Sequence, residues 1–190
     1  MQTGIYPYVQ WTWISVGIVW LAAGLAAKRA ARTEAVRSRL THLAVITAAF
    51  ALLFSARLRA GALAWRFVPG TPAIAWTGFA LTVAGCGFAV WARLLLGSNW
   101  SGTVTVKLDH QLIRKGPYTI VRHPIYSGAL LGMCGTALAF GEIRGLLGLA
   151  LAFIAWRTKS SLEEAFMTQQ FGAAYAEYQR EVKALIPFVL

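Results

Sequence analysis

Long stretches without charged side chains constrain this chain more than any other feature. One of them lies between Arg66 and Arg93, where no Asp, Glu, Lys or Arg occurs. About 20 apolar residues are enough for a helix to cross the hydrocarbon core of a bilayer. Charged residues make up 13% of the chain, whereas soluble domains contain about 25%. We therefore predict a protein with several membrane helices and no separate soluble domain.

The same pattern predicts an all-α, polytopic membrane protein with about five transmembrane helices. The apolar runs place these helices at about residues 9–27, 40–56, 73–96, 123–141 and from 146 onward. The fifth run is too short to span alone, and its helical pattern continues, so we expect this helix to extend into the cytoplasm. We treat 1–190 as one membrane domain, with three helices in 1–96 and a cofactor-binding catalytic half in 97–190.

Loop charges set the expected orientation. Lys and Arg cluster after residue 27 and again between 97 and 122, and the positive-inside rule places both loops in the cytoplasm. The N-terminus is then outside, and the C-terminal helices form a cytoplasmic cap. Arg57, Arg59 and Arg66 conflict with this orientation, because they fall on a loop that should face outward.

Glycines and helix-ending residues predict how the helices pack and where they end. We predict that glycines on the third and fourth helices allow close helix packing: Gly85, Gly87, Gly128 and Gly132. The alternation in 103–106 predicts an extended segment. Phe171-Gly172 is expected to break the last helical pattern, and 185–187 (Leu-Ile-Pro) to end it.

The net charge of +11 does not indicate nucleic-acid binding. The cations lie between apolar runs, so membrane topology and anionic headgroups account for them better than a basic stripe on a polar module does. Cys86 and Cys134 form no C-x-x-C pair, and the three histidines have no paired spacing with acids, so we predict no metal site.

Three polar clusters are expected on the cytoplasmic side: 110–118, 122–126 and 157–164. A hairpin of the fourth and fifth helices would bring the second and third together. Cations, carboxylates and aromatic rings in one pocket suit a zwitterionic ligand with an aromatic base. Simpler alternatives exist for each residue: Arg122 and His123 as headgroup anchors, Glu163 and Glu164 as a solvated helix face, and the tyrosines as interface anchors.

The ordered motifs of this region resemble a known superfamily. They are Gly116-Pro117-Tyr118, then 122–128 (Arg-His-Pro-Ile-Tyr-Ser-Gly), Glu163-Glu164, Phe171-Gly172-x-x-Tyr175-x-x-Tyr178 and Leu185-Ile186-Pro187. The pattern, which covers roughly residues 91–190, is similar to that of the isoprenylcysteine carboxyl methyltransferase and phospholipid methyltransferase superfamily. These are integral membrane enzymes that use S-adenosylmethionine.

The resemblance implies an S-adenosylmethionine-dependent methyltransferase and a set of site residues. Glu163 would contact the polar end of the cofactor. The other cofactor-binding residues would be His110, Gln111, Leu112, Ile113, Tyr118, His123, Pro124, Ile125 and Tyr126. We predict catalytic roles for Lys159, Arg157, Arg122 and Glu164.

The acceptor would be a lipid or another apolar molecule of the bilayer, and no obligate protein partner is expected. The family commonly has an arginine where this chain has Lys159. Lysine lacks the two-pronged donor geometry that suits a carboxylate. This departure favours a lipid amine or a small acceptor over a prenylcysteine carboxylate, and Glu164 would be the base for an amine. The alternatives are an NADPH-dependent enzyme of the sterol-reductase type and a non-catalytic membrane protein of the same fold.

Overall fold

The computed structural model describes residues 4–24, 32–33, 36–97, 105–106 and 112–190. Within them the fold is all-α apart from a two-residue strand pair. The α-helices are α1 (Tyr6–Gly24), α2 (Val36–Phe54), α3 (Pro72–Leu96), α4 (Pro124–Phe140), α5 (Ile143–Phe171) and α6 (Ala173–Glu181). The strands β1 (Arg32–Thr33) and β2 (Thr105–Val106) pair antiparallel. The predicted extended segment is thus confirmed at 105–106, while 103–104 lie outside the described residues.

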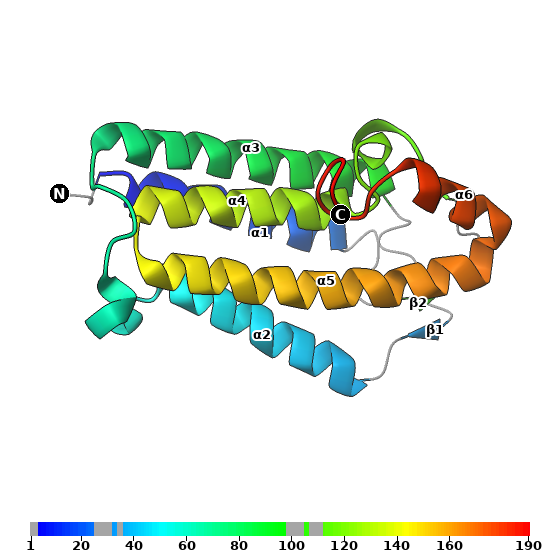
Figure 1. Cartoon of the computed structure of the whole chain (residues 1–190), viewed down its shortest axis with the longest axis horizontal. Helices are drawn as coiled ribbons and strands as arrows, with labels where there is room; N and C mark the ends of the chain where they lie inside the picture. The colour runs from blue at the N-terminus through cyan, green and yellow to red at the C-terminus, as the bar shows by residue number, and fades with distance from the viewer. Residues whose placement is uncertain (1–3, 25–31, 34–35, 98–104, 107–111) are drawn as a thin grey trace.

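Helices α1 to α5 run along the long axis of the molecule (Figure 1). The predicted helices at 73–96 and 123–141 match α3 and α4 to within a few residues. By length and composition, α2 and α3 are the described helices able to cross a membrane, and α4 is a shorter apolar helix.

Helices α3 and α4 pack backbone to backbone. A Cβ atom added to Gly85 would lie 2.6 Å from the carbonyl oxygen of Gly128, and one added to Gly78 would lie 2.6 Å from that of Gly135. The predicted glycine contacts are therefore confirmed for Gly85, Gly128 and Gly132. The prediction is wrong for Gly87, which has no atom within 4 Å of an added Cβ, because it lies on another face of α3.

Hydrogen bonds within the apolar bundle join three of its helices. Trp13 of α1 donates from Nε1 to Thr136 Oγ1 of α4 at 2.9 Å. The same hydroxyl lies 3.2 Å from Thr82 Oγ1 of α3. Each threonine hydroxyl also lies 2.9 Å from a carbonyl oxygen of its own helix, that of Gly78 for Thr82 and that of Gly132 for Thr136, and either hydroxyl can donate to the other. These buried polar groups are satisfied, as an apolar surrounding requires.

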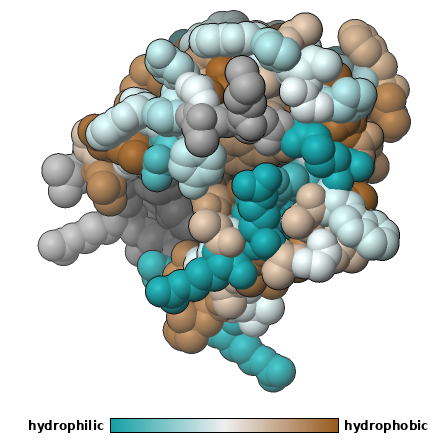
Figure 2. Space-filling model, turned by 90° about the vertical axis from the view of Figure 1, so that its left-hand side faces the viewer, coloured by the Kyte–Doolittle hydropathy of each residue, from teal (hydrophilic) through white to brown (hydrophobic). Residues whose placement is uncertain are grey.

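The end of the bundle where α4 turns into α5 holds a separate ion-pair cluster. Buried Glu142 binds Arg59 at 2.7 Å and Arg144 at 2.6 Å. Arg66 donates to the carbonyl of Phe140 at 3.1 Å, near the C-terminus of α4. Arg59 and Arg66 are thus held by protein groups, which accounts for two of the three cations that conflict with the predicted orientation. Figure 2 views this end and shows hydrophilic residues bordered by hydrophobic ones.

The opposite end is shaped by α5, which continues beyond the other helices (Figure 1). As predicted, α5 extends past its apolar part and ends at Gly172, whose φ of 52° suits glycine. The last helix ends earlier than predicted, at Glu181 instead of 185–187. The reason is that the carbonyls of Lys183 and Ala184 accept hydrogen bonds from Arg122 N and His123 N at 2.8 and 3.0 Å, which draws the chain away from helical geometry.

Candidate active site

The sequence cluster around His123 is placed where α4 begins. Pro124 is the first residue of α4, a position at which its missing N–H costs no hydrogen bond. Ser127 Oγ donates to the carbonyl of Leu185 at 2.6 Å. The C-terminal segment therefore binds both the approach to α4 and its first turn, so the side chains at this helix start have fixed positions opposite α5.

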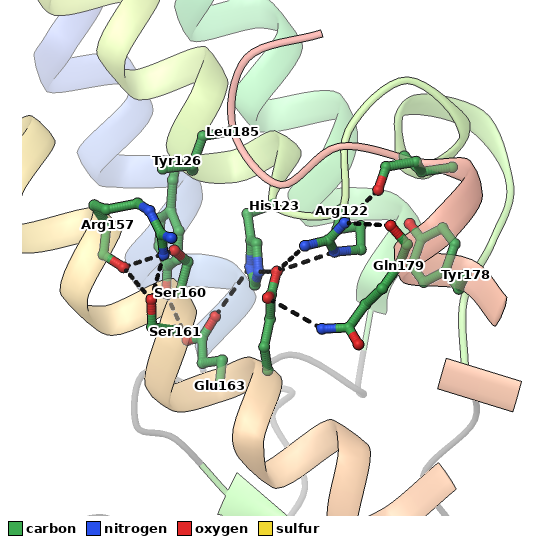
Figure 3. Close-up of polar contacts among 12 residues, drawn as sticks. Arg122, His123, Tyr126, Arg157, Ser160, Ser161, Glu163, Tyr178, Gln179 and Leu185 are labelled. Atoms are coloured by element: carbon green, nitrogen blue, oxygen red, sulfur yellow. Dashed lines mark hydrogen bonds and ion pairs between the residues drawn. The ribbon is translucent and has the colours of Figure 1, made fainter. Parts of the chain in front are cut away.

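A hydrogen-bonded group of three side chains joins α4 to α5 (Figure 3). Tyr126 donates from its hydroxyl to Glu163 Oε1 at 2.6 Å, and His123 Nδ1 lies 3.3 Å from Glu163 Oε2. The rings of His123 and Tyr126 stack at 5.8 Å between centroids, and Trp156 stacks on the other face of Tyr126 at 6.0 Å. The predicted meeting of the 122–126 and 157–164 clusters is confirmed.

Glu164 lies beside this group and is bound by different partners. Its Oε1 accepts from Arg122 Nε at 3.0 Å and lies 3.0 Å from His123 Nε2. Its Oε2 accepts from Gln179 Nε2 of α6 at 3.2 Å. Arg122 also donates to the carbonyls of Gln179 and Val182. Arg122 and Glu164 therefore tie α4, α5 and α6 together.

The buried charges at this site stabilise one another. Burial alone would lower the pKa of His123, but hydrogen bonds and charge attraction from Glu163 and Glu164 raise it above its ordinary value. Burial would raise the pKa of Glu163, but the His123 and Tyr126 hydrogen bonds and nearby Lys159 lower it. The pKa of Glu164 is lowered to about 2, because His123 and Arg122 outweigh its burial. At neutral pH both carboxylates are ionised.

Other predicted cofactor residues come before α4 in the chain. Tyr118 belongs to η4 (Gly116–Thr119) and is buried, with its hydroxyl 3.5 Å from the carbonyl oxygen of Ala92 and its own carbonyl accepting from Tyr178. Leu112 and Ile113 are half-buried. His110 and Gln111 lie outside the described residues.

The predicted catalytic cations point in different directions. Arg157 donates to Ser161 Oγ one turn along α5 (Figure 3). Lys159 instead lines a pocket between the helices. Of the predicted catalytic residues, Lys159 therefore borders the pocket, and Arg122 and Glu164 are hydrogen-bonded to each other.

This pocket has a volume of about 750 Å³ and a mainly apolar lining from α1 to α5. Its walls include Trp13 and Trp20 of α1, Phe50 of α2 and Trp156 of α5. Tyr126 borders it too, so one side chain belongs both to the apolar pocket and to the hydrogen-bonded group around Glu163. The pocket can accept an apolar tail and place its head beside the polar group.

The sequence analysis missed three polar lining residues, Gln10 of α1 and Arg39 and His42 of α2. Arg39 was interpreted as part of the basic loop that sets the topology, and His42 was placed in the second apolar run. Nothing in the local pattern distinguishes them from other interfacial residues, because their place in the pocket depends on how α2 packs against α5.

The chain matches the family model described as phospholipid methyltransferase over residues 73–174. It belongs to the phospholipid methyltransferase family. The matched range contains Tyr126, Lys159, Glu163 and Glu164, and excludes α1, α2 and all but the first two residues of α6. Its family, its fold and the apolar helices α2 and α3 together support a location in the membrane.

The chain is also similar to curated relatives and to a solved structure, and their names are consistent with this family. The chain is 31% identical over 131 residues to protein-S-isoprenylcysteine O-methyltransferase B of Arabidopsis thaliana, covering 65% of this chain and 66% of that protein. It is 32% identical over 103 residues to the Schizosaccharomyces pombe protein-S-isoprenylcysteine O-methyltransferase, covering 52% and 43%. For the Homo sapiens protein of that name the identity is 30% over 129 residues, covering 65% and 45%.

The solved structure supports the fold. A eukaryotic intramembrane Ras methyltransferase, isoprenylcysteine carboxyl methyltransferase, superposes with a TM-score of 0.53 and 24% identity, covering 80% of this chain and 52% of that one. The chain thus spans less than two thirds of the length of these relatives.

Proposed function

We propose that this protein is a membrane methyltransferase that uses S-adenosylmethionine and methylates an acceptor carrying an apolar tail. The observation that carries the proposal is the position of Tyr126. Its ring borders the apolar pocket, and its hydroxyl donates to Glu163 at 2.6 Å. A water-soluble donor and a lipid-like acceptor require such a junction between a polar site and an apolar one.

The cofactor fits the polar side of this junction. When bound, S-adenosylmethionine supplies an electrophilic methyl group on a sulfonium. Glu163 is ionised and its side chain is 21% exposed, so it can accept hydrogen bonds from the cofactor's ammonium group. His123, Tyr126, Pro124 and Ile125 remain the proposed residues of this side, and Tyr126 and Ile125 also border the apolar pocket. Leu112, Ile113 and Tyr118, with His110 and Gln111, remain the proposed adenosine-binding set.

The acceptor head is placed near Lys159, with its tail in the pocket. A carboxylate acceptor forms the new O–C bond while the methyl–sulfur bond breaks, and it yields an ester without any proton to remove. An amine acceptor must lose a proton to a base. Glu164 is a poor base, because it is held by Arg122, His123 and Gln179. We therefore place a prenylcysteine-like carboxylate first, the substrate class that the names of the relatives indicate, and assign Arg122 and Glu164 positioning roles.

The topology that goes with this function is the one predicted above. Five helices would span the bilayer with the N-terminus outside, and the polar site with α6 would form a cytoplasmic cap, where the soluble cofactor is available. The exposed apolar side chains and the shared long-axis direction of α1, α3, α4 and α5 support the membrane-spanning part of this proposal, and residues 1–190 would act as one domain.

Ligand binding tests the function directly. Calorimetry on the detergent-solubilised protein should detect S-adenosylhomocysteine and no NADPH, and labelled S-adenosylmethionine should transfer its methyl group to S-farnesylcysteine. Binding of NADPH alone would favour the reductase alternative. Binding of neither ligand would favour a non-catalytic membrane protein.

A further inference from the structure

Helix α2 brings a cation to the pocket from outside the range that matches the family model. Its lining residues are Arg39, His42, Leu43, Ile46, Phe50 and Phe54. They recur every three to four residues, with His42 and Leu43 adjacent, which places them on one face of the helix. From Arg39 to Phe54 this face extends about 22 Å, which is enough for an extended isoprenoid or acyl tail. Only the N-terminal end of the face, at Arg39 and His42, is polar.

The packing of α2 on α5 places Arg39 level with Lys159. These helices touch at Ala49 and Gly148, where an added Cβ on Gly148 would lie 2.7 Å from the carbonyl oxygen of Ala49. The helices run antiparallel, with α2 diverging from α5 toward the site (Figure 1). Arg39 is ten residues before Ala49 and Lys159 is eleven after Gly148, so each lies about 15 to 16 Å from that contact.

The pocket therefore has one charged end, and its charge is positive. Arg39 and Lys159 are both lining residues, and none of the described lining residues is an Asp or Glu. Lys159 provides a single point charge, whereas a guanidinium donates two parallel hydrogen bonds that match a carboxylate. Arg39 is exposed, so a ligand can reach it.

We propose that Arg39 binds the carboxylate of the methyl acceptor and makes the enzyme specific for tailed acids over neutral or cationic tailed molecules. The proposal rests on the proposed function, since it concerns the acceptor side of the same site. It adds a residue from α2, beyond the family-matched region, to the recognition of the acceptor head.

Comparing the binding of an acid and of its amide tests whether Arg39 binds the carboxylate. The affinities of S-farnesylcysteine and its carboxamide, which differ in the charge of the head, are measured by calorimetry on the solubilised full chain. The unaltered protein should bind the acid more tightly than the amide. Arg39→Gln should weaken binding of the acid about ten- to a hundredfold, the range for losing hydrogen bonds to a charged group, and leave the amide nearly unchanged. Arg39→Lys should restore part of the preference.

Arg37→Gln is the matched control, because Arg37 is exposed on the same turn of α2 and does not line the pocket. S-adenosylhomocysteine affinity, measured on each variant, reports whether the protein is folded. Equal affinity of the unaltered protein for the acid and the amide overturns the proposal, even if Arg39→Gln does not fold. So does an equal loss for both ligands in Arg39→Gln, which would indicate contact with the tail or with lipid headgroups. Failure of the unaltered protein to bind S-adenosylhomocysteine would instead overturn the proposed function.

Discussion

At the residue scale, Glu163 and Glu164 are neighbours in sequence with different surroundings. Glu163 binds Tyr126 and His123 and keeps part of its side chain exposed, whereas Glu164 is bound by Arg122, His123 and Gln179. Because adjacent residues on a helix project about 100° apart, one faces the site and the other the α6 side. Their side-chain exposures are similar, 21% and 16%, so the different partners are what support our proposal of a cofactor-binding role for Glu163 and a positioning role for Glu164.

Replacing Glu163 should weaken cofactor binding. We expect Glu163→Gln to reduce S-adenosylhomocysteine affinity by about 1–3 kcal/mol, the usual cost of losing a hydrogen bond to a charged group. Glu177→Gln is the control, since Glu177 is an exposed acid of α6. Unchanged affinity in Glu163→Gln, measured by calorimetry in detergent, would remove Glu163 from the cofactor site.

Lys159 should affect turnover more than cofactor binding. It lines the apolar pocket, so Lys159→Ala should lower the rate of methyl transfer and raise KM for the acceptor, with S-adenosylhomocysteine affinity retained. Steady-state kinetics with labelled S-adenosylmethionine measure both quantities. An equal loss of cofactor affinity would move Lys159 into the nucleotide site.

The Glu164 ion pair should make stability depend on pH in a defined direction. Its carboxyl pKa is lowered from 4.5 to about 2, so its contribution is complete above pH 4.5 and is lost as the pH falls toward 2. The raised pKa of His123, normally 6.5, adds stability that is complete below 6.5 and is lost at higher pH. The difference in melting temperature between the unaltered protein and Glu164→Gln should be greatest between these two values. A difference that is constant from pH 3 to 8 would contradict this assignment.

At the element scale, the contact between α3 and α4 holds the start of α4 in place. This contact depends on glycines that allow the two backbones to touch, and α4 carries His123 and Tyr126 at its N-terminal end. Small residues at such crossings let helices pack closely inside a membrane. The position of the site is therefore set partly by glycines that lie outside it.

Two glycines of α3 provide a matched test of this contact. Gly85→Ala would place a methyl group 2.6 Å from the Gly128 carbonyl oxygen, and the resulting overpacking should cost about 1–3 kcal/mol. Gly87→Ala meets no atom within 4 Å and should be neutral or slightly stabilising, since alanine favours the helix. Melting temperatures in detergent measure both, and equal effects would refute the role of Gly85.

At the scale of the whole molecule, two polar ends flank an apolar bundle. One end holds Glu142 with Arg59 and Arg144, and the other holds the proposed active site. If the site faces the cytoplasm, a fluorescent protein fused after Leu190 should be fluorescent in cells, and alkaline phosphatase fused before Met1 should be active outside. The opposite result for both fusions would invert the proposed topology.

The sequence by itself determined the helices and the residues of the polar group. Hydropathy is a local property, and a helix that crosses a bilayer needs a known number of apolar residues, so α3 and α4 could be placed within a few residues. The motifs around His123 and Glu163 could be assigned to one site because they match the same superfamily. Only the tertiary structure decided which cations border the pocket, that Gly85 and not Gly87 touches α4, and that Glu164 is bound by Arg122. The physical reason is that the direction in which a side chain points, and the helix it packs against, depend on contacts between residues far apart in the chain. The contact of α2 with α5, for example, joins residues almost 100 positions apart, and no local sequence pattern contains that information.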